Sequence, residues 1–200
     1  MRYRRRWDFQ VSDADNFFVV CAQKIYRAKP LTAQPYNVLF LCTGNSARSI
    51  MSESLLRHWG GDSFAAYSAG SHPKGEVHPL AMDLLQRMHL PTEGLRSKSW
   101  DEFAAPGAPQ LDFVITVCDA AAGETGPVWP GQPMKAHWGT RDPAACQGSE
   151  RDRIFEFRRA LMELENRIKV FVNLPLRSLD RIRIQHHMDT LGQTKLVSYE

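Results

Sequence analysis

The sequence has no long apolar run, and this absence limits what the protein can be. A membrane-spanning helix needs about 18 or more consecutive apolar residues, whereas the longest apolar runs here are FFVVCA at 17–22 and VLFLC at 38–42. With 43% hydrophobic and 24% charged residues among 200, the composition is that of an ordinary globular domain. We expect one soluble domain with a single core, and we exclude collagen-like and low-complexity chains.

Cysteine is also scarce, and its spacing excludes several kinds of site. Four cysteines occur, Cys21, Cys42, Cys118 and Cys146, and no two of them form a C-x-x-C pair. This spacing argues against a disulfide-stapled fold, a zinc ribbon and a thioredoxin-like dithiol. Since no credible signal peptide precedes them, we expect free thiols in a reducing cytoplasm.

Positive charge is concentrated in one short segment. Residues 1–36 hold seven basic and three acidic side chains, so the other 164 carry 18 basic and 19 acidic ones. A near-neutral body gives no electrostatic reason to expect a nucleic-acid or membrane partner. We interpret 1–36 as a basic leader, disordered or loosely docked, 37–192 as the folded domain, and 193–200 as a tail.

The body of the chain alternates between strand and helix patterns. Short apolar runs predict strands at 37–42, 64–70, 111–118 and 134–139, and periodic apolar residues predict helices at 47–59, 78–90, 99–106 and, last, 150–172. This alternation favours a three-layer α/β sandwich with a four-stranded parallel sheet. Ligands of such sheets bind beyond the carboxyl ends of the strands, so residues that follow each strand are the candidates for chemistry.

The loop after the first strand has the composition of an oxyanion site. Cys42 ends the strand, and the C-x5-R-S loop then leads into a helix. Successive backbone N–H groups in such a loop form an anion-binding nest, and the helix N-terminus adds its positive dipole end. The candidate oxyanion-binding residues are Thr43, Gly44, Asn45, Ser46, Ala47, Arg48 and Ser49.

Individual side chains of this loop suit nucleophilic catalysis. Gly44 and Asn45 tolerate the positive φ angles that such a turn demands, and Arg48 can donate two parallel hydrogen bonds to an anion. The same field is expected to lower the pKa of Cys42 and to hold it as a thiolate nucleophile. Ser49 can donate a further hydrogen bond to the sulfur. The competing interpretation of Cys42 is an ordinary buried thiol.

Other candidate residues lack the context that makes this loop distinctive. Cys21 and Arg27 repeat the C-x5-R spacing, but no turn former lies between them, so we treat that spacing as coincidence. No nucleotide-binding fingerprint follows the first strand. We assign the remaining candidates to surface, capping or packing roles rather than to metal binding or catalysis: His72, His78, His186, His187, Trp129 and Trp138.

Four stretches of the chain together resemble a known family. LCTGNSARS, SAGSHPKGEVHP, VITVCDAAAGE and HWGTRDPA are similar to segments of the low-molecular-weight protein tyrosine phosphatase superfamily and, within it, of the phosphatase-derived arsenate reductases. The resemblance extends from about Asn37 to about Leu191. It implies a four-stranded parallel sheet, a cysteine nucleophile and a general acid delivered from a late loop.

Two further site residues come from this resemblance. Asp142, in an Asp-Pro pair after the predicted fourth strand, matches the general acid, although Asp-Pro alone is also common turn chemistry. Cys118 matches the cysteine that attacks the cysteine–arsenate adduct in the reductases; a buried structural thiol is the alternative. The phosphatases place an aromatic residue after Asp-Pro, whereas Ala144 and Ala145 follow here.

The resemblance is incomplete at the third redox cysteine. Relatives commonly carry a cysteine before a proline in the segment after Cys118, where this chain has Gly126-Pro127. We expect no bound cofactor or metal and an external thiol donor, glutathione with glutaredoxin or thioredoxin, with Cys146 as a less favoured substitute. The predicted function is thiol-dependent arsenate reduction. The alternatives are hydrolysis of phosphotyrosine or another phosphomonoester, and an oxyanion-binding module without catalysis.

Overall fold

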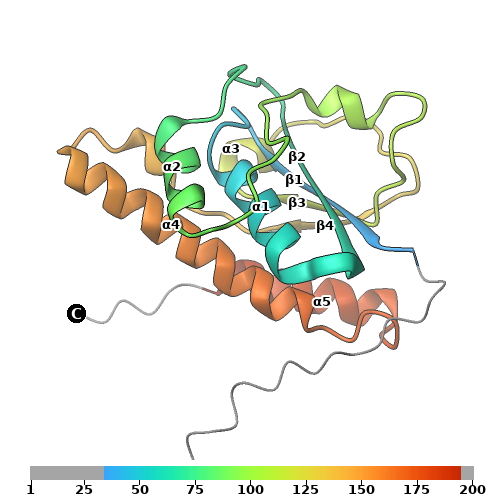
Figure 1. Ribbon diagram of the computed structural model, residues 1–200. Coiled ribbons are helices and arrows are strands. Elements are labelled where there is room, and N and C mark those ends of the chain that lie inside the picture. The colour runs from blue at the N-terminus through green and yellow to red at the C-terminus, as the bar shows by residue number, and fades with distance from the viewer. Residues whose placement is uncertain (1–33, 195–200) are drawn as a thin grey trace, which may run out of the picture. The chain divides into compact units, whose positions relative to one another are not determined.

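The computed structural model describes residues 34–194 and contains the predicted sheet (Figure 1). All neighbouring strands pair in parallel, in the order β2-β1-β3-β4. The four-stranded parallel α/β fold is therefore confirmed. The observed strands are β1 (Tyr36–Cys42), β2 (Phe64–Gly70), β3 (Phe113–Thr116) and β4 (Met134–His137).

The continuous apolar run of β1 is explained by burial on both faces of the sheet. Val38 and Phe40 point into one core cluster, and Leu39 and Leu41 point into a second one on the opposite face. All four side chains are buried. A central parallel strand needs apolar residues at every position, and this is why the run does not alternate with polar residues.

Most helices pack on the face of the sheet that carries Val38 and Phe40. Figure 1 shows α4 as the long helix running beside α1, and α1 in turn contacts β1 and β2. The α-helices are α1 (Arg48–Gly60), α2 (Pro79–Arg87), α3 (Asp119–Ala122), α4 (Glu150–Val172) and α5 (Arg181–Gln193); short 3₁₀ turns are η1 (Gly61–Ser63), η2 (Trp100–Phe103) and η3 (Pro143–Ala145).

Helix α4 follows its sequence pattern closely. Ser149 and Asp152 form a capping box that fixes its start. The apolar stripe is buried from Phe157 to Phe171, while Ile154 at its beginning is half-buried. Each fully buried side chain of this kind contributes roughly 1.5–3 kcal/mol to folding, so the stripe anchors the helix firmly to the core.

The prediction that α4 is the last helix is wrong, because α5 follows it. The Asp180 side chain accepts a hydrogen bond from the backbone N–H of Arg183 (2.8 Å) and caps α5. Apolar side chains of α5 then pack into the core. The helix lies against β4, where the Gln185 side chain donates to the carbonyl oxygen of Lys135 (2.7 Å).

The opposite face of the sheet has a thinner cover. Leu39, Leu41 and Val114 pack there against Phe103 of η2 and against Trp129. The helix predicted at 99–106 is the single 3₁₀ turn η2, and the rest of this layer is irregular chain. The predicted third layer therefore exists without a long helix.

Some predictions fall outside the described residues. The predicted leader 1–36 is described only from residue 34, so the Cys21–Arg27 spacing lies outside the described residues. Of the predicted tail 193–200, residues 195–200 lie outside, and Gln193 belongs to α5. Between residues 34 and 194, no helix is long and apolar enough to cross a membrane.

Candidate functional site

The loop that follows β1 adopts a tight turn before α1. Asn45 lies at positive φ (39°), as predicted for a turn former in this loop, whereas Gly44 does not. Gly70, at the end of β2, lets the loop approach closely, since a Cβ there would lie 2.5 Å from the carbonyl oxygen of Thr43. The close packing of these backbones explains why β2 ends in glycine.

The carbonyl groups of the loop are turned outward. Three of them accept hydrogen bonds from the backbone of the segment 72–78: Thr43 from His72 (2.9 Å), Gly44 from Lys74 (3.0 Å) and Ser46 from His78 (2.8 Å). In a trans peptide the N–H points opposite to the carbonyl. The N–H groups that follow these carbonyls therefore point away from the segment 72–78, which is compatible with the predicted anion-binding nest.

Cys42 lies at the base of the loop, with only 3% of its surface exposed. Its sulfur is 2.9 Å from the Ser49 hydroxyl, so the predicted hydrogen bond is present. Burial nevertheless raises the pKa of the Cys42 thiol, against the predicted lowering. The hydroxyl and backbone N–H of Ser49 and the charge of Arg48 act in the opposite direction but are outweighed by desolvation.

A buried polar network packs against the loop and supports it. The sequence analysis missed this network. The Asn45 side chain donates to the hydroxyls of Ser49 (2.9 Å) and Ser68 (3.0 Å) and accepts from the backbone N–H of Lys98 (2.8 Å). Asn45, Ser49 and Ser68 are fully buried. Because all of these groups are hydrogen-bonded, they fix the strained backbone at Asn45.

The network ends on a buried ion pair. Glu53 of α1 accepts from the Ser68 hydroxyl (2.5 Å), lies 3.5 Å from the Lys98 ammonium and pairs with Arg57. Glu53 is 1% and Lys98 8% exposed. Burial lowers the pKa of Lys98, and the Glu53 carboxylate opposes that shift. Nothing in the local sequence pattern distinguished these residues from exposed helix and loop charges.

Arg48 and Asp142, far apart in the sequence, form an ion pair (Nη2 to Oδ2, 3.1 Å). Arg48 also donates to the carbonyl oxygen of Thr140 (3.0 Å). Asp142 begins η3, and its carboxylate accepts from the backbone N–H of Ala144 (3.1 Å). The segment after β4 thus brings a half-exposed carboxylate to the arginine of the Cys42 loop.

The second predicted redox residue, Cys118, is brought to the same edge of the sheet. Strand β3 pairs with β1, and Val117 donates to the carbonyl oxygen of Leu41 (2.8 Å). The Cys118 sulfur lies 3.7 Å from the Thr43 hydroxyl, which also contacts Glu124 (3.5 Å). Cys42 and Cys118 are buried free thiols, and the charge of a Cys118 thiolate would raise the pKa of Cys42.

Cys146 is placed differently from these two thiols. It follows η3, is half-buried, and donates its backbone N–H to the carbonyl oxygen of Pro143 (3.4 Å). No hydrogen bond or ion pair among the described residues connects it to Cys42 or Cys118. Within residues 34–194, no hydrogen bond or ion pair therefore orients Cys146 toward the candidate redox pair.

His78 and the two tryptophans have capping and packing contacts of the kind predicted for them. The His78 ring accepts from the backbone N–H of Leu80 (3.2 Å), which caps α2, and it packs on Phe157. Trp129 and Trp138 are buried in the core. His186 and His187 lie on α5, and no group of three or more potential metal ligands occurs among residues 34–194.

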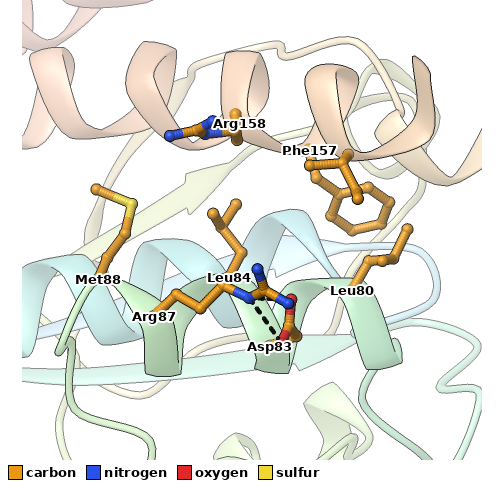
Figure 2. Close-up of a pocket in the computed structure, with 8 residues that line it drawn as sticks. Leu80, Asp83, Leu84, Arg87, Met88, Phe157 and Arg158 are labelled. Carbon is orange, nitrogen blue, oxygen red and sulfur yellow. Dashed lines mark hydrogen bonds and ion pairs between the residues drawn. The ribbon is translucent and has the colours of Figure 1, made fainter. Parts of the chain in front are cut away.

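A cavity of about 190 Å³ lies between α2 and α4, away from the loop (Figure 2). Leu80, Leu84 and Met88 line one side of it, and Phe157 and Arg158 line the other. None of the predicted catalytic or oxyanion-binding residues lines this cavity. The candidate catalytic residues lie at the carboxyl ends of the strands instead.

Comparison with known proteins gives a consistent assignment. Residues 37–183 match the family model of the low molecular weight phosphotyrosine protein phosphatases. An arsenate reductase of Bacillus subtilis is 35% identical over 134 residues, which cover 67% of this chain and 93% of the relative. An arsenate reductase of Shouchella clausii is 34% identical with the same coverage.

Solved structures of similar proteins agree with this assignment. The crystal structure of an arsenate reductase from Archaeoglobus fulgidus has a TM-score of 0.54 and 28% identity, and it covers 68% of this chain and 99% of its own. An arsenate reductase solved in a phosphate-binding state has a TM-score of 0.56 and 26% identity, with coverage of 68% and 96%.

Proposed function

The chain belongs to the low molecular weight phosphotyrosine protein phosphatase family, and we propose that it is a thiol-dependent arsenate reductase. The observation that carries this proposal is the second buried thiol beside the Cys42 loop: Cys118 lies two residues beyond β3, the strand that pairs with β1, and its sulfur contacts the Thr43 hydroxyl of the loop. Hydrolysis of a phosphate ester needs no second thiol, whereas reduction of arsenate by a pair of cysteines does. The names of the relatives point in the same direction.

In the first step the loop binds arsenate through its inward N–H groups and Arg48. The Cys42 thiolate attacks arsenic, an As–S bond forms, and an As–O bond breaks. Asp142 donates its proton to the departing oxygen, which leaves as water. Arg48 changes partner in this scheme, since the guanidinium now paired with Asp142 takes the anion, and the carboxyl group is released toward the leaving oxygen.

In the second step Cys118 attacks the Cys42 sulfur of the adduct. An S–S bond forms, the S–As bond breaks, and its electron pair stays on arsenic, which leaves as arsenite with the Cys118 proton. Arsenic gains two electrons and the two thiols lose them. Because burial raises the pKa of Cys42, its proton must leave before the first step, and in this scheme it passes through the bound oxyanion to the Asp142 carboxylate, which then gives it to the departing oxygen. The Ser49 hydroxyl, 2.9 Å away, stabilises the thiolate so formed.

An external thiol then reduces the Cys42–Cys118 disulfide. Gly126 occupies the place of a third redox cysteine, and it lies beside Trp100 and Trp129. A reducing cytoplasm supplies two suitable donors, thioredoxin and glutathione with glutaredoxin. The substrate is the oxyanion alone, with no bound cofactor.

The proposal is tested by assaying purified protein for arsenite formation with each donor, and in parallel for aryl phosphate hydrolysis. Mass spectrometry of protein quenched under limiting reductant should find the Cys42–Cys118 disulfide. Cys118→Ser should stop multiple turnovers with arsenate and keep hydrolysis, because hydrolysis needs only Cys42, Arg48 and Asp142. Full arsenate turnover by Cys118→Ser would overturn the proposal.

The second candidate function is hydrolysis of a phosphomonoester, which the family model favours. Cys42, Arg48 and Asp142 suffice for it. Two small residues follow Asp142-Pro143, Ala144 and Ala145, so no aromatic platform for a tyrosine ring stands there. Strong hydrolysis without arsenite formation under either donor would establish this function instead.

A further inference from the structure

A buried arginine on α4, Arg167, holds the segment that leads from β4 to Asp142. Its side chain is only 3% exposed. One guanidinium nitrogen, Nη1, donates to three consecutive residues of that segment: to the carbonyl oxygens of Trp138 (3.1 Å) and Gly139 (3.3 Å) and to the hydroxyl of Thr140 (2.9 Å). A single side chain from a distant helix thus fixes the backbone just before the candidate acid.

Keeping a guanidinium at this place is energetically unfavourable for the core. Burial lowers the pKa of Arg167, and Glu163 on the same helix opposes that shift through a 2.7 Å hydrogen bond. The Nε atom is buried and, among the described residues, has no acceptor. An apolar side chain of similar volume would avoid this desolvation, so the gain lies in what the arginine positions.

Thr140 transmits this restraint to the site. Its hydroxyl accepts from Arg167, while its carbonyl oxygen accepts from Arg48 (3.0 Å). Its backbone N–H donates to the carbonyl oxygen of Val117 (3.2 Å), one residue before Cys118. Two residues further on, Asp142 pairs with Arg48. Thr140 is therefore held between the core arginine on one side and the anion-binding arginine on the other.

We propose that Arg167 is a positioning residue for the general acid: by fixing Trp138–Thr140 it sets where the Asp142 carboxyl meets the leaving oxygen. This inference rests on the proposed acid role of Asp142. It implies that loss of Arg167 weakens protonation of the leaving group while the Cys42 loop continues to bind anions.

The test compares two aryl phosphates whose leaving groups differ in their need for a proton. Phenyl phosphate releases a basic phenolate that needs the acid, whereas p-nitrophenyl phosphate releases a stabilised one. In Arg167→Met, kcat with phenyl phosphate should fall about a hundredfold, within the range that general acid catalysis contributes. With p-nitrophenyl phosphate it should fall less than about tenfold, and the alkaline limb of the pH profile should flatten. Arg159→Met, a more exposed arginine of the same helix, is the matched control.

Asp142→Asn separates the two ideas. If it fails to discriminate between the two esters, the acid role itself is wrong. Suppose instead that kcat of Asp142→Asn falls more with phenyl phosphate than with p-nitrophenyl phosphate. If kcat of folded Arg167→Met then falls equally with both esters, or with neither, the positioning role is wrong. The affinity for inorganic phosphate should stay within about threefold of wild type in Arg167→Met, because the loop is intact; a larger loss would contradict the inference.

Two further variants keep the test decisive. If Arg167→Met does not fold, Thr140→Val removes one acceptor of Arg167, and its kcat should again fall more with phenyl phosphate than with p-nitrophenyl phosphate, by a smaller factor. Equal fold-losses of kcat on the two esters would overturn the inference. If wild-type protein hydrolyses neither ester, arsenate reduction is followed against pH. There, Arg167→Met should lose the alkaline limb together with Asp142→Asn, and an unchanged limb in Arg167→Met would overturn the inference.

Discussion

The two sides of the site are held in place very differently. On the Cys42 side, Asn45, Ser49 and Ser68 are fully buried and hydrogen-bonded to one another. On the Cys118 side, Asp119 of the four-residue helix α3 has a side chain that is 93% exposed and is hydrogen-bonded to the His137 ring (3.0 Å), and in the irregular chain that follows Val128 is also 93% exposed. The difference indicates that the loop of Cys42, the proposed nucleophile, is preorganised, whereas the chain after Cys118, the proposed resolving thiol, is more exposed to solvent and held less firmly.

The largest expected effect is the loss of activity when Cys42, on the more rigid side of the site, is replaced. Cys42→Ser should abolish arsenate reduction and ester hydrolysis, each by more than about a thousandfold, because a serine hydroxyl is not ionised near neutral pH. Inorganic phosphate should still bind, as measured by calorimetry. A variant that keeps either activity would show that the chemistry does not pass through this loop.

A large loss of stability is expected when the network under the loop is broken. Glu53→Ala leaves the buried Lys98 ammonium without its carboxylate, which should lower the free energy of unfolding by about 3–5 kcal/mol and weaken phosphate binding. Urea unfolding measures the first and calorimetry the second. The exposed pair Asp83–Arg87 is the control, and Asp83→Ala should cost about 1 kcal/mol or less. Equal losses in the two variants would mean that the buried network stabilises the fold no more than an exposed ion pair does.

On the Cys118 side of the site, one substitution can add a reactive thiol with only a small effect on stability. A Cβ at Gly126 would meet Trp100 and Trp129 at 3.6 to 3.9 Å, which is ordinary contact, so Gly126→Cys should change stability by about 1 kcal/mol or less. If the chain after Cys118 is mobile, the disulfide trapped during turnover should shift from Cys42–Cys118 to one between Cys118 and the introduced thiol. Mass spectrometry detects the shift, and an unchanged Cys42–Cys118 product would contradict this mobility.

The smallest expected effect is a change of stability with pH, caused by His78 at the N-terminal cap of α2. Burial, followed by the charge of Lys74, lowers the pKa of His78 below its ordinary value, and its Nδ1 must be unprotonated to accept from Leu80. The unfolded chain then binds more protons than the folded one between the two pKa values, so stability falls as pH drops from above 6.5 through the folded-state pKa.

His78→Asn provides the matched control for this pH effect. An asparagine at the cap accepts the same hydrogen bond at any pH. Urea unfolding at pH 7.5 and pH 5 should show that wild type loses up to about 1 kcal/mol more than His78→Asn. Parallel losses in the two proteins would assign the acid sensitivity to other groups.

The sequence predicted the elements of the fold better than their arrangement. All four strands were located, and the apolar runs of β1 and β3 reflect their burial in the middle of the sheet, whereas β4 at its end exposes Lys135 and His137. The position of β3 beside β1, which brings Cys118 next to Cys42, is a long-range pairing without a local signal. Helix α5 was missed although Ile184, Met188 and Leu191 have helical spacing, because the surrounding residues are polar.

At the site, local chemistry was predictable and long-range electrostatics were not. The turn at Asn45 and the contact between Ser49 and Cys42 follow from residues within one loop. The rise in the pKa of Cys42 depends on how deeply the folded chain buries its sulfur, which no motif encodes. Arg167 resembles in the sequence the exposed charges of its helix, and only its burial in the folded chain distinguishes it from them.

Helix α5 also lies against the edge of the sheet formed by β4. β4 is the last strand of its sheet, and an uncovered edge of this kind offers free backbone groups to any other chain that can add a strand. Gln185 of α5 occupies the Lys135 carbonyl oxygen, and Trp138, just beyond β4, donates to the carbonyl oxygen of Met188. The helix therefore lies along the edge of β4, where a further strand could otherwise pair, in addition to its place in the core.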